Sequence, residues 1–125
     1  MNLVDSSGWL EYFANSKNAD FFATAIEDTE QLIVSTINLY EVFNKILQQR
    51  DENSAFQAVA LMQQGKVIDV DSSISLISAK QSIDLQLPMA DSIILATANV
   101  FSATLWTQDS DFKGIPGIKY IQKSS

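Results

Sequence analysis

Hydrophobic and polar positions follow two different periods along the chain, and these periods predict strands and helices in alternation. Short apolar runs predict strands at residues 2–5, 31–35, 66–70, 103–107 and 118–122. Apolar residues spaced three and four apart predict helices at residues 6–15, 19–30, 38–50, 51–65, 71–85 and 89–101. The last of these, "MADSIILATANVF", is apolar on nearly every side, so we expect that helix to be buried.

Strands that alternate with helices typically form a parallel sheet with helices on both faces. We therefore predict an α/β fold of three layers, α/β/α, around a central parallel sheet of four to five strands. The chain has 125 residues, which is enough for one compact domain with a hydrophobic core. Because no linker or repeat divides the sequence, we expect a single domain over residues 1–125.

The residue types that the chain lacks exclude several kinds of chemistry. It has no Cys and no His, which excludes disulfides, thiolate nucleophiles, Ser-His-Asp triads and the usual zinc ligands. Any catalysis must use carboxylates, hydroxyls, Lys or a metal ion. The apolar runs are too short to cross a bilayer, and "MNLVDSSGWL" does not resemble a secretion signal. A cytoplasmic protein that does not enter a membrane is therefore expected.

The charge balance bears on the kind of partner. The formal net charge is -7 at pH 7, so the chain repels phosphate at long range and attracts cations or a basic partner protein. Nucleic-acid binding through an overall positive field is excluded, because domains that bind in this way are basic. Contact with a nucleic acid would have to be local.

Four acidic residues from distant parts of the sequence fall at corresponding places in the predicted fold. Asp5 ends the first strand, and Asp109 follows the strand at 103–107. Glu41 and Asp91 each lie in the predicted first turn of a helix. The carboxyl ends of parallel strands meet at one edge of a sheet, where ligand sites form. We therefore expect all four acids at the same rim.

Each of these acids also has an ordinary structural interpretation. Asp5 suits an N-cap, and Asn38 with Glu41 has the spacing of a capping box. Asp91 suits a helix N-terminus, and Asp109 suits an Asx turn. Their joint occurrence favours a site, because carboxylates held close together need cations or protons. Oxygen ligands without His or Cys suit Mg²⁺ or Mn²⁺, ions that promote phosphodiester hydrolysis.

Four blocks of the sequence, taken together and in order, resemble PIN-domain ribonucleases of the VapC toxin type. The blocks are "VDSSGWLEYF", "STINLYEVFNKIL", "LPMADSIILATA" and "LWTQDSDF". The resemblance implies a PIN-like α/β/α fold and cleavage of RNA by a water that Mg²⁺ or Mn²⁺ activates. It also implies that Asp5, Glu41, Asp91 and Asp109 are the catalytic, metal-coordinating acids.

The same resemblance extends to the residues around these acids and to partners. Asp111 is a further metal-site candidate, and we interpret Asp109 as the ligand and Asp111 as the supporting residue. Ser7 and Thr107 are candidates to hydrogen-bond a carboxylate or a metal-bound water. VapC-type toxins form homodimers and are inhibited by a small antitoxin that inserts a basic or aromatic segment into the acidic groove. Candidate contacts to RNA phosphates, which equally suit a solvated surface, are Lys45, Arg50, Lys80 and Lys113.

Two other functions stay open at this point. A phosphatase or phospho-acceptor domain could use a similar sheet. However, a haloacid-dehalogenase-like phosphatase needs a second Asp where Ser7 stands, and a response-regulator receiver needs an acidic pair after the first strand. The other alternative is a non-catalytic PIN fold that only binds partners, and the presence of all four acids disfavours it.

Overall fold

A five-stranded parallel sheet forms the centre of the molecule, with strand order β3-β2-β1-β4-β5. The computed structural model describes residues 1–123. The strands are β1 (Asn2–Val4), β2 (Leu32–Ser35), β3 (Lys66–Ile68), β4 (Thr104–Thr107) and β5 (Ile118–Tyr120). The helices are α1 (Ser6–Phe13), α2 (Ala19–Ile26), α3 (Thr36–Gln49), α4 (Glu52–Met62), α5 (Ser72–Leu85) and α6 (Met89–Val100).

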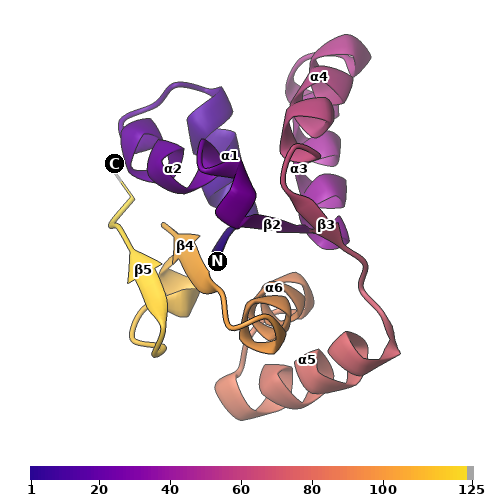
Figure 1. Ribbon diagram of the computed structural model, residues 1–125, viewed down its shortest axis with the longest axis vertical. Coiled ribbons are helices and arrows are strands. Elements are labelled where there is room, and N and C mark those ends of the chain that lie inside the picture. The colour runs from indigo at the N-terminus through magenta and orange to yellow at the C-terminus, as the bar shows by residue number, and fades with distance from the viewer. Residues whose placement is uncertain (124–125) are drawn as a thin grey trace.

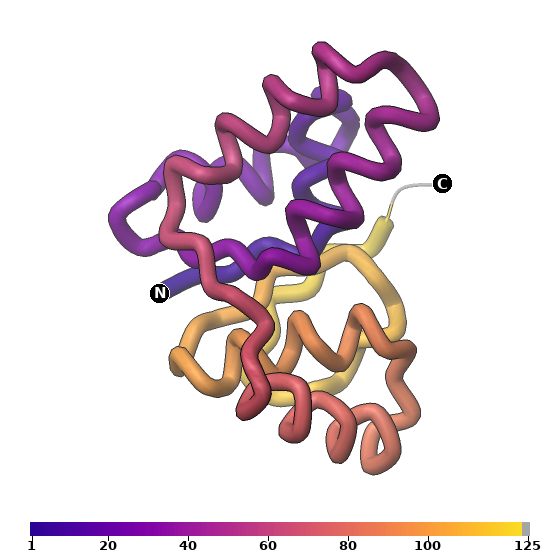
Figure 2. Tube along the Cα trace, turned by 90° about the vertical axis from the view of Figure 1, so that its right-hand side faces the viewer, coloured from indigo at the N-terminus to yellow at the C-terminus, as the bar shows by residue number. Residues whose placement is uncertain are grey.

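The helices lie on both faces of the sheet, so the predicted three-layer α/β/α fold is confirmed. Helices α1 to α4 lie on one side of the strands and α5 and α6 on the other (Figure 1). The side view in Figure 2 shows the same layers, with the strands crossing between the two groups of helices. The five strands are also within the predicted range of four to five.

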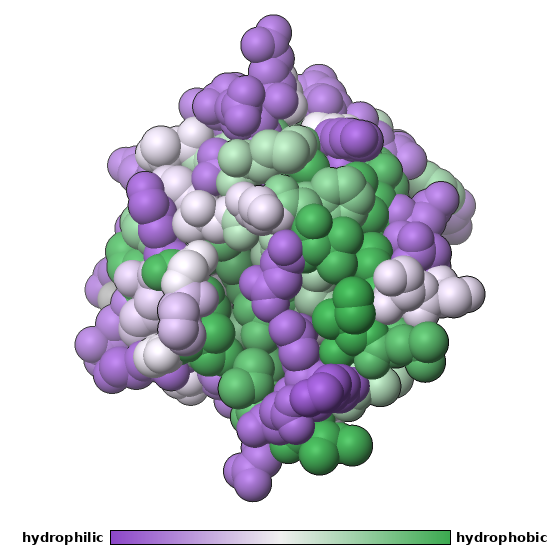
Figure 3. Space-filling view, turned by 60° about the horizontal axis from the view of Figure 1, so that its bottom comes forward, coloured by the Kyte–Doolittle hydropathy of each residue, from purple (hydrophilic) through white to green (hydrophobic). Residues whose placement is uncertain are grey.

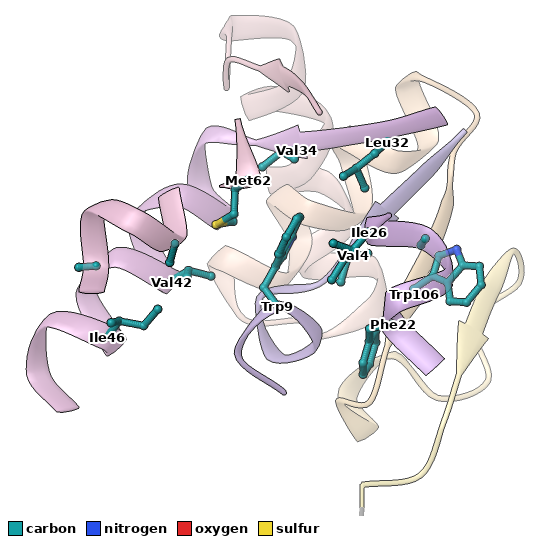
Figure 4. Close-up of a cluster of buried hydrophobic side chains, with 13 residues drawn as sticks. Val4, Trp9, Phe22, Ile26, Leu32, Val34, Val42, Ile46, Met62 and Trp106 are labelled. Atoms are coloured by element: carbon teal, nitrogen blue, oxygen red, sulfur yellow. The ribbon is translucent and has the colours of Figure 1, made fainter. Parts of the chain in front are cut away.

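Alternate side chains of the strands enter two separate hydrophobic cores. Val4 and Trp106 pack with Trp9 and Phe22 in the core beneath α1 to α4, which Figure 4 shows in close-up. Their strand neighbours, including Leu3, belong to the core beneath α5 and α6. Successive side chains of a strand point to opposite faces of a sheet, which explains this division. Both faces of β1 are therefore buried, and β1 holds a fixed position for the residues that follow it.

Helix α1 lies close against the sheet because Gly8 has no side chain. A Cβ atom at Gly8 would lie 2.6 Å from the ring of Phe22 and 2.7 Å from a methyl carbon of Val4. Gly8 is followed directly by Trp9, which is fully buried. This close packing fixes the turn between β1 and α1, the segment that carries Asp5.

Several element boundaries differ from the sequence prediction. The helix predicted at 19–30 ends at Ile26, and a short 3-10 helix, Thr29–Gln31, leads into β2. The helix predicted from residue 38 begins at Thr36, because Ser35 is its N-cap and forms a capping box with Asn38. The predicted pairing of Asn38 with Glu41 is therefore wrong. Glu41 lies in the second turn of α3, where it has no capping role.

The strand order creates a switch point between β1 and β4. From β1 the chain adds β2 and β3 on one side, and it later adds β4 and β5 on the other side. The connections that leave β1 and β4 therefore diverge at the carboxyl edge of the sheet, which leaves room for a ligand. Asp5 and Asp109 lie on these two connections. Among residues 1–123, no helix is both long and apolar enough to cross a membrane.

Candidate metal centre

Three carboxylates meet at the carboxyl edge of the sheet. One carboxylate oxygen from each of Asp91, Asp109 and Asp111 lies within 4.8 Å of the other two. Asp91 comes from the first turn of α6, as predicted. Asp109 and Asp111 come from the turn after β4, where a 3-10 helix, Ser110–Phe112, begins. The structure thus brings acids from two distant segments together.

Asp5 is held at the end of β1 by three hydrogen bonds. Its Oδ1 accepts from the backbone N–H of Ser6 at 2.9 Å, which confirms its role as the N-cap of α1. Its Oδ2 accepts from the hydroxyl of Ser7 at 2.7 Å and from that of Thr107 at 2.9 Å. The carboxylate is buried, with only 3% of the residue exposed. Both candidate hydroxyl residues therefore donate to the same carboxylate oxygen.

Glu41 is connected to α1 by two hydrogen bonds that the sequence does not predict. The hydroxyl of Ser6 donates to Glu41 Oε1 at 2.7 Å, and Asn38 Nδ2 donates to that hydroxyl at 2.9 Å. The spacing of Ser35 and Asn38 is a visible helix-start signal. Nothing local to Asn38 indicates the second contact, because it joins residues 32 positions apart in the sequence.

The turn after β4 is ordered by backbone donors. The N–H of Asp109 donates to Thr107 Oγ1 at 2.9 Å, and the N–H of Asp111 donates to Asp109 Oδ1 at 2.9 Å. The second bond is the Asx turn expected for Asp109. Asp109 is partly buried, whereas Asp111 is exposed. Thr107 thus links the Asp109 backbone to the Asp5 carboxylate.

Gln108, which is buried, is another residue that the sequence analysis misses. Its Nε2 donates to Glu11 Oε1 at 3.2 Å, and its Oε1 accepts from Asn18 Nδ2 at 2.9 Å. Asn18 also donates to the backbone carbonyl of Gln122 at 3.2 Å. These bonds tie the segment that precedes Asp109 to α1, to the start of α2 and to the segment after β5.

Burial and mutual repulsion raise the pKa of two of the acids. Burial raises the pKa of Asp5 to about 6; the hydrogen bonds from Ser7 and Thr107 oppose the rise, and the charges of Asp109 and Glu41 add to it. Asp91 has its pKa raised to about 8, first by burial, then by a hydrogen bond with Asp111, and then by the charges of its acidic neighbours. The cluster therefore holds protons near neutral pH that a cation would displace.

A single groove brings the four predicted acids together. It has a volume of about 410 Å³, and its walls include Asp5, Glu41, Asp91 and Asp109. Asp111 reaches the same place through its contact with Asp91 and Asp109. The donors are all carboxylate oxygens, and they suit a hard divalent cation such as Mg²⁺ or Mn²⁺. Asp91 and Asp109 belong both to the close cluster and to the groove wall.

Comparisons with known proteins agree with this fold. The PIN domain model matches residues 3–118. A toxin–antitoxin complex from Klebsiella pneumoniae has a chain 25% identical, with a TM-score of 0.79 over 94% of this chain and 95% of that chain. VapC20 of Mycobacterium tuberculosis, described as a sarcin-ricin loop cleaving toxin, is 13% identical, with a TM-score of 0.78 over 95% of this chain and 98% of that one.

A DNA-bound VapBC from Salmonella typhimurium is 16% identical, with a TM-score of 0.74 over 98% of both chains. Comparison with curated protein sequences finds no match. These findings give no support to the phosphatase or phospho-acceptor alternative. Because the PIN domain model spans most of the sequence and agrees with the observed fold, the chain belongs to the PIN domain family.

Proposed function

We propose that this chain is a divalent-metal-dependent endoribonuclease and the toxin of a VapBC-type toxin–antitoxin pair. The observation that carries the proposal is the groove at the sheet edge, where acids from β1, α3, α6 and the turn after β4 converge. Family membership supports it, as does the likeness to VapC-type toxins, one of which is described as a sarcin-ricin loop cleaving toxin. RNA is abundant in the cytoplasm, which is the proposed place of action.

The acids of the groove are the groups that would hold the ion. Asp91, Asp109 and Asp111 supply the closest set of oxygens, and Asp5 and Glu41 lie on the walls of the same groove. When bound, Mg²⁺ or Mn²⁺ supplies positive charge against the scissile phosphate and lowers the pKa of a water molecule. We propose Asp109 as a direct ligand and Asp111 as its support.

The other residues of the site orient these acids. Ser7 and Thr107 donate to Asp5 Oδ2 and so fix that carboxylate. Ser6 donates to Glu41 Oε1, and within residues 1–123 this is the one hydrogen bond to the carboxylate of Glu41. Oε2 of Glu41 is therefore free to accept a proton in the groove from a water that attacks the phosphate. Asn38 holds Ser6 in place for this role.

Metal removal tests the proposal. The purified protein is expected to cleave RNA from a broad pool when Mg²⁺ or Mn²⁺ is present, to stop when EDTA is added, and to resume when excess metal is restored. The Asp91→Asn variant, purified in the same way, controls for contaminating nucleases. Cleavage that persists unchanged in EDTA, or its absence with both metals, would contradict the proposal. Induced expression without an antitoxin is expected to stop bacterial growth, which separates a toxin from a housekeeping nuclease.

An antitoxin with a basic segment is the proposed protein partner. Several solved structures similar to this chain are toxin–antitoxin complexes. The net charge of -7 and the carboxylates of the groove favour a positively charged segment at this place. A bound basic segment would neutralise the acids and block access to them.

A second copy of the chain is the other proposed partner, and the exposed face of α5 is its proposed contact. Large apolar side chains there are unusually exposed, with Leu76 at 74%, Ile83 at 80% and Met89, at the start of α6, at 72%. Figure 3 brings the bottom of the molecule forward and shows hydrophobic side chains gathered on it. Contiguous apolar surface of this kind typically marks an interface.

Disrupting this face is expected to produce monomers. In the dimer proposed here, Ile83→Asp places a charge in an apolar contact, so light scattering is expected to give the mass of one chain. Leu47→Asp, an equivalent change on α3, is expected to leave the dimer intact and serves as the control. A wild-type protein that is monomeric at all concentrations would contradict the proposed dimer.

A further inference from the structure

A second hollow adjoins the acidic groove, and the two meet at the proposed metal centre. The first, here called the α3 hollow, is the groove of about 410 Å³ whose walls also include Tyr40 and Lys45. The second, here called the C-terminal hollow, has a volume of about 460 Å³ and includes Tyr120 and Lys123 in its walls. Ser7 and Asp109 belong to both. The two hollows therefore adjoin at Ser7 and Asp109, at one end of the proposed metal centre.

Each hollow has one lysine in its walls. Lys45 lies one helical turn beyond Glu41 on α3. Lys123 follows Gln122, whose carbonyl is held by Asn18. Neither lysine forms a salt bridge within residues 1–123. An otherwise acidic depression thus carries a free positive charge on each side of its centre, an arrangement that suits a polyanion which crosses it.

The other candidate phosphate contacts are engaged or lie elsewhere. Lys80 is paired with Asp84 at 2.6 Å on the surface of α5. Arg50 lines a separate hollow between α1, α3 and α4. Lys113 is not among the residues that line either hollow, although its Nζ lies 6.0 Å from the ring centre of Tyr120. The structure therefore selects Lys45 from the four candidates and adds Lys123, which sequence analysis does not select.

An aromatic ring accompanies each lysine. Tyr40 is 67% exposed, although a large aromatic side chain on a helix usually buries most of its surface. Tyr120 is partly exposed in the C-terminal hollow. Nucleic-acid bases stack on such rings only when they are unpaired, as in single strands and loops. The combination of lysine and tyrosine therefore favours single-stranded RNA over a duplex.

We propose that single-stranded RNA crosses both hollows, with the scissile phosphate at the acids between them. Lys45 binds a phosphate on one side of that bond and Lys123 binds a phosphate on the other side. Tyr40 and Tyr120 stack the bases that flank the cleaved position. This inference rests on the proposed ribonuclease function and adds to it the path of the substrate and the residues that bind it.

The test measures RNA binding separately from cleavage. An end-labelled single-stranded RNA of mixed sequence is titrated with protein that carries Asp91→Asn to prevent cleavage, and anisotropy is recorded over a series of salt concentrations. Lys45→Ala and Lys123→Ala are each expected to weaken binding about five-fold near 0.1 M salt and to lower the salt slope by about 0.7. Lys45→Arg is expected to restore binding, and Lys80→Ala, which lies outside both hollows, is expected to change nothing.

The tyrosines and a duplex provide the remaining comparisons. Tyr40→Ala is expected to weaken binding of the single strand about five-fold or more, whereas Tyr40→Phe keeps the ring and the affinity. A duplex of the same sequence is expected to bind more weakly and to be insensitive to Tyr40→Ala. Lysine variants that bind RNA with the wild-type affinity and salt slope would overturn the proposed path. Lysine variants that bind an antitoxin more weakly but bind RNA as the wild type does would overturn it too.

Cleavage by the protein without the Asp91→Asn change separates this inference from the function on which it rests. If this protein cleaves RNA while both lysine variants bind normally, the function stands and the path is wrong. If it never cleaves RNA but the lysine variants lose binding, the path is supported and the catalytic function fails. If it does not bind RNA at all, both are wrong.

Discussion

Replacing Asp91 with Asn is expected to reduce kcat for RNA cleavage by about a hundred-fold or more, with no loss of folding. Asn preserves the shape of the side chain but removes its negative charge. Asp91 has oxygens close to those of both Asp109 and Asp111, so the loss of its charge weakens the proposed site at its centre. Asp5→Asn is expected to have a similar effect, because it removes the charge and replaces one of the two oxygens that accept from Ser6, Ser7 and Thr107 with an amide nitrogen, which donates.

The matched control is Asp84→Asn, the same chemical change at an exposed acid on α5 outside the groove. Its cleavage rate is expected to equal that of the wild type. Asp109→Asn is expected to reduce kcat more than Asp111→Asn does, because Asp109 also lies in the wall of the groove. Steady-state kinetics on one RNA substrate measure all of these variants. Equal rates for the wild type and Asp91→Asn would exclude the acid cluster from catalysis.

The metal-free protein is expected to lose stability as the pH rises from about 4 to about 8. Folding raises the pKa of Asp5 to about 6 and that of Asp91 to about 8, so the folded state binds more protons than the unfolded state in this window. Their stabilising contribution is complete below the unfolded pKa and is lost as the pH passes through the folded pKa. For the buried Asp5, a shift from 3.8 to about 6 corresponds to about 3 kcal/mol.

Thermal unfolding in EDTA measures this effect, with a lower Tm expected at pH 8 than at pH 5 because of the two raised pKa values. Mg²⁺ or Mn²⁺ is expected to raise the Tm at pH 8 and to have much less effect at pH 5, where protons occupy the cluster. Asp91→Asn is expected to raise the Tm in EDTA at pH 8, because it removes the repulsion. A Tm in EDTA that rises over this pH range would contradict the electrostatic account.

The layers of the fold could be predicted from the sequence because a strand that is buried on both faces is a continuous run of apolar residues. Leu3 and Val4 lie on opposite faces of β1, and each face is covered by helices, so the strand is apolar throughout. The order of strands in the sheet is not visible in this pattern. The sequence therefore does not show that β1 and β4 are neighbours, a pairing that allows Thr107 to donate to Asp5 across 102 positions.

The candidate acids could be predicted because each ends a strand or begins a helix near the same edge. The position of Glu41 differs from the prediction. Because the capping box at Ser35 and Asn38 starts α3 at Thr36, Glu41 lies in the second turn of the helix and not in the first. Ser6 and Asn38 could not be recognised, because their contact with each other depends on how α1 and α3 pack. The sequence does not distinguish the roles of Asp109 and Asp111, because the turn after β4 folds both of them toward Asp91.

Isothermal titration calorimetry with Mn²⁺ at pH 8 tests most directly whether the acid cluster is a metal centre. This measurement needs no knowledge of the RNA substrate. The account predicts saturable binding to the wild type and to Asp84→Asn, and an affinity reduced about ten-fold or more in Asp91→Asn. Equal Mn²⁺ binding by the wild type and Asp91→Asn, or no binding by the wild type, would contradict it.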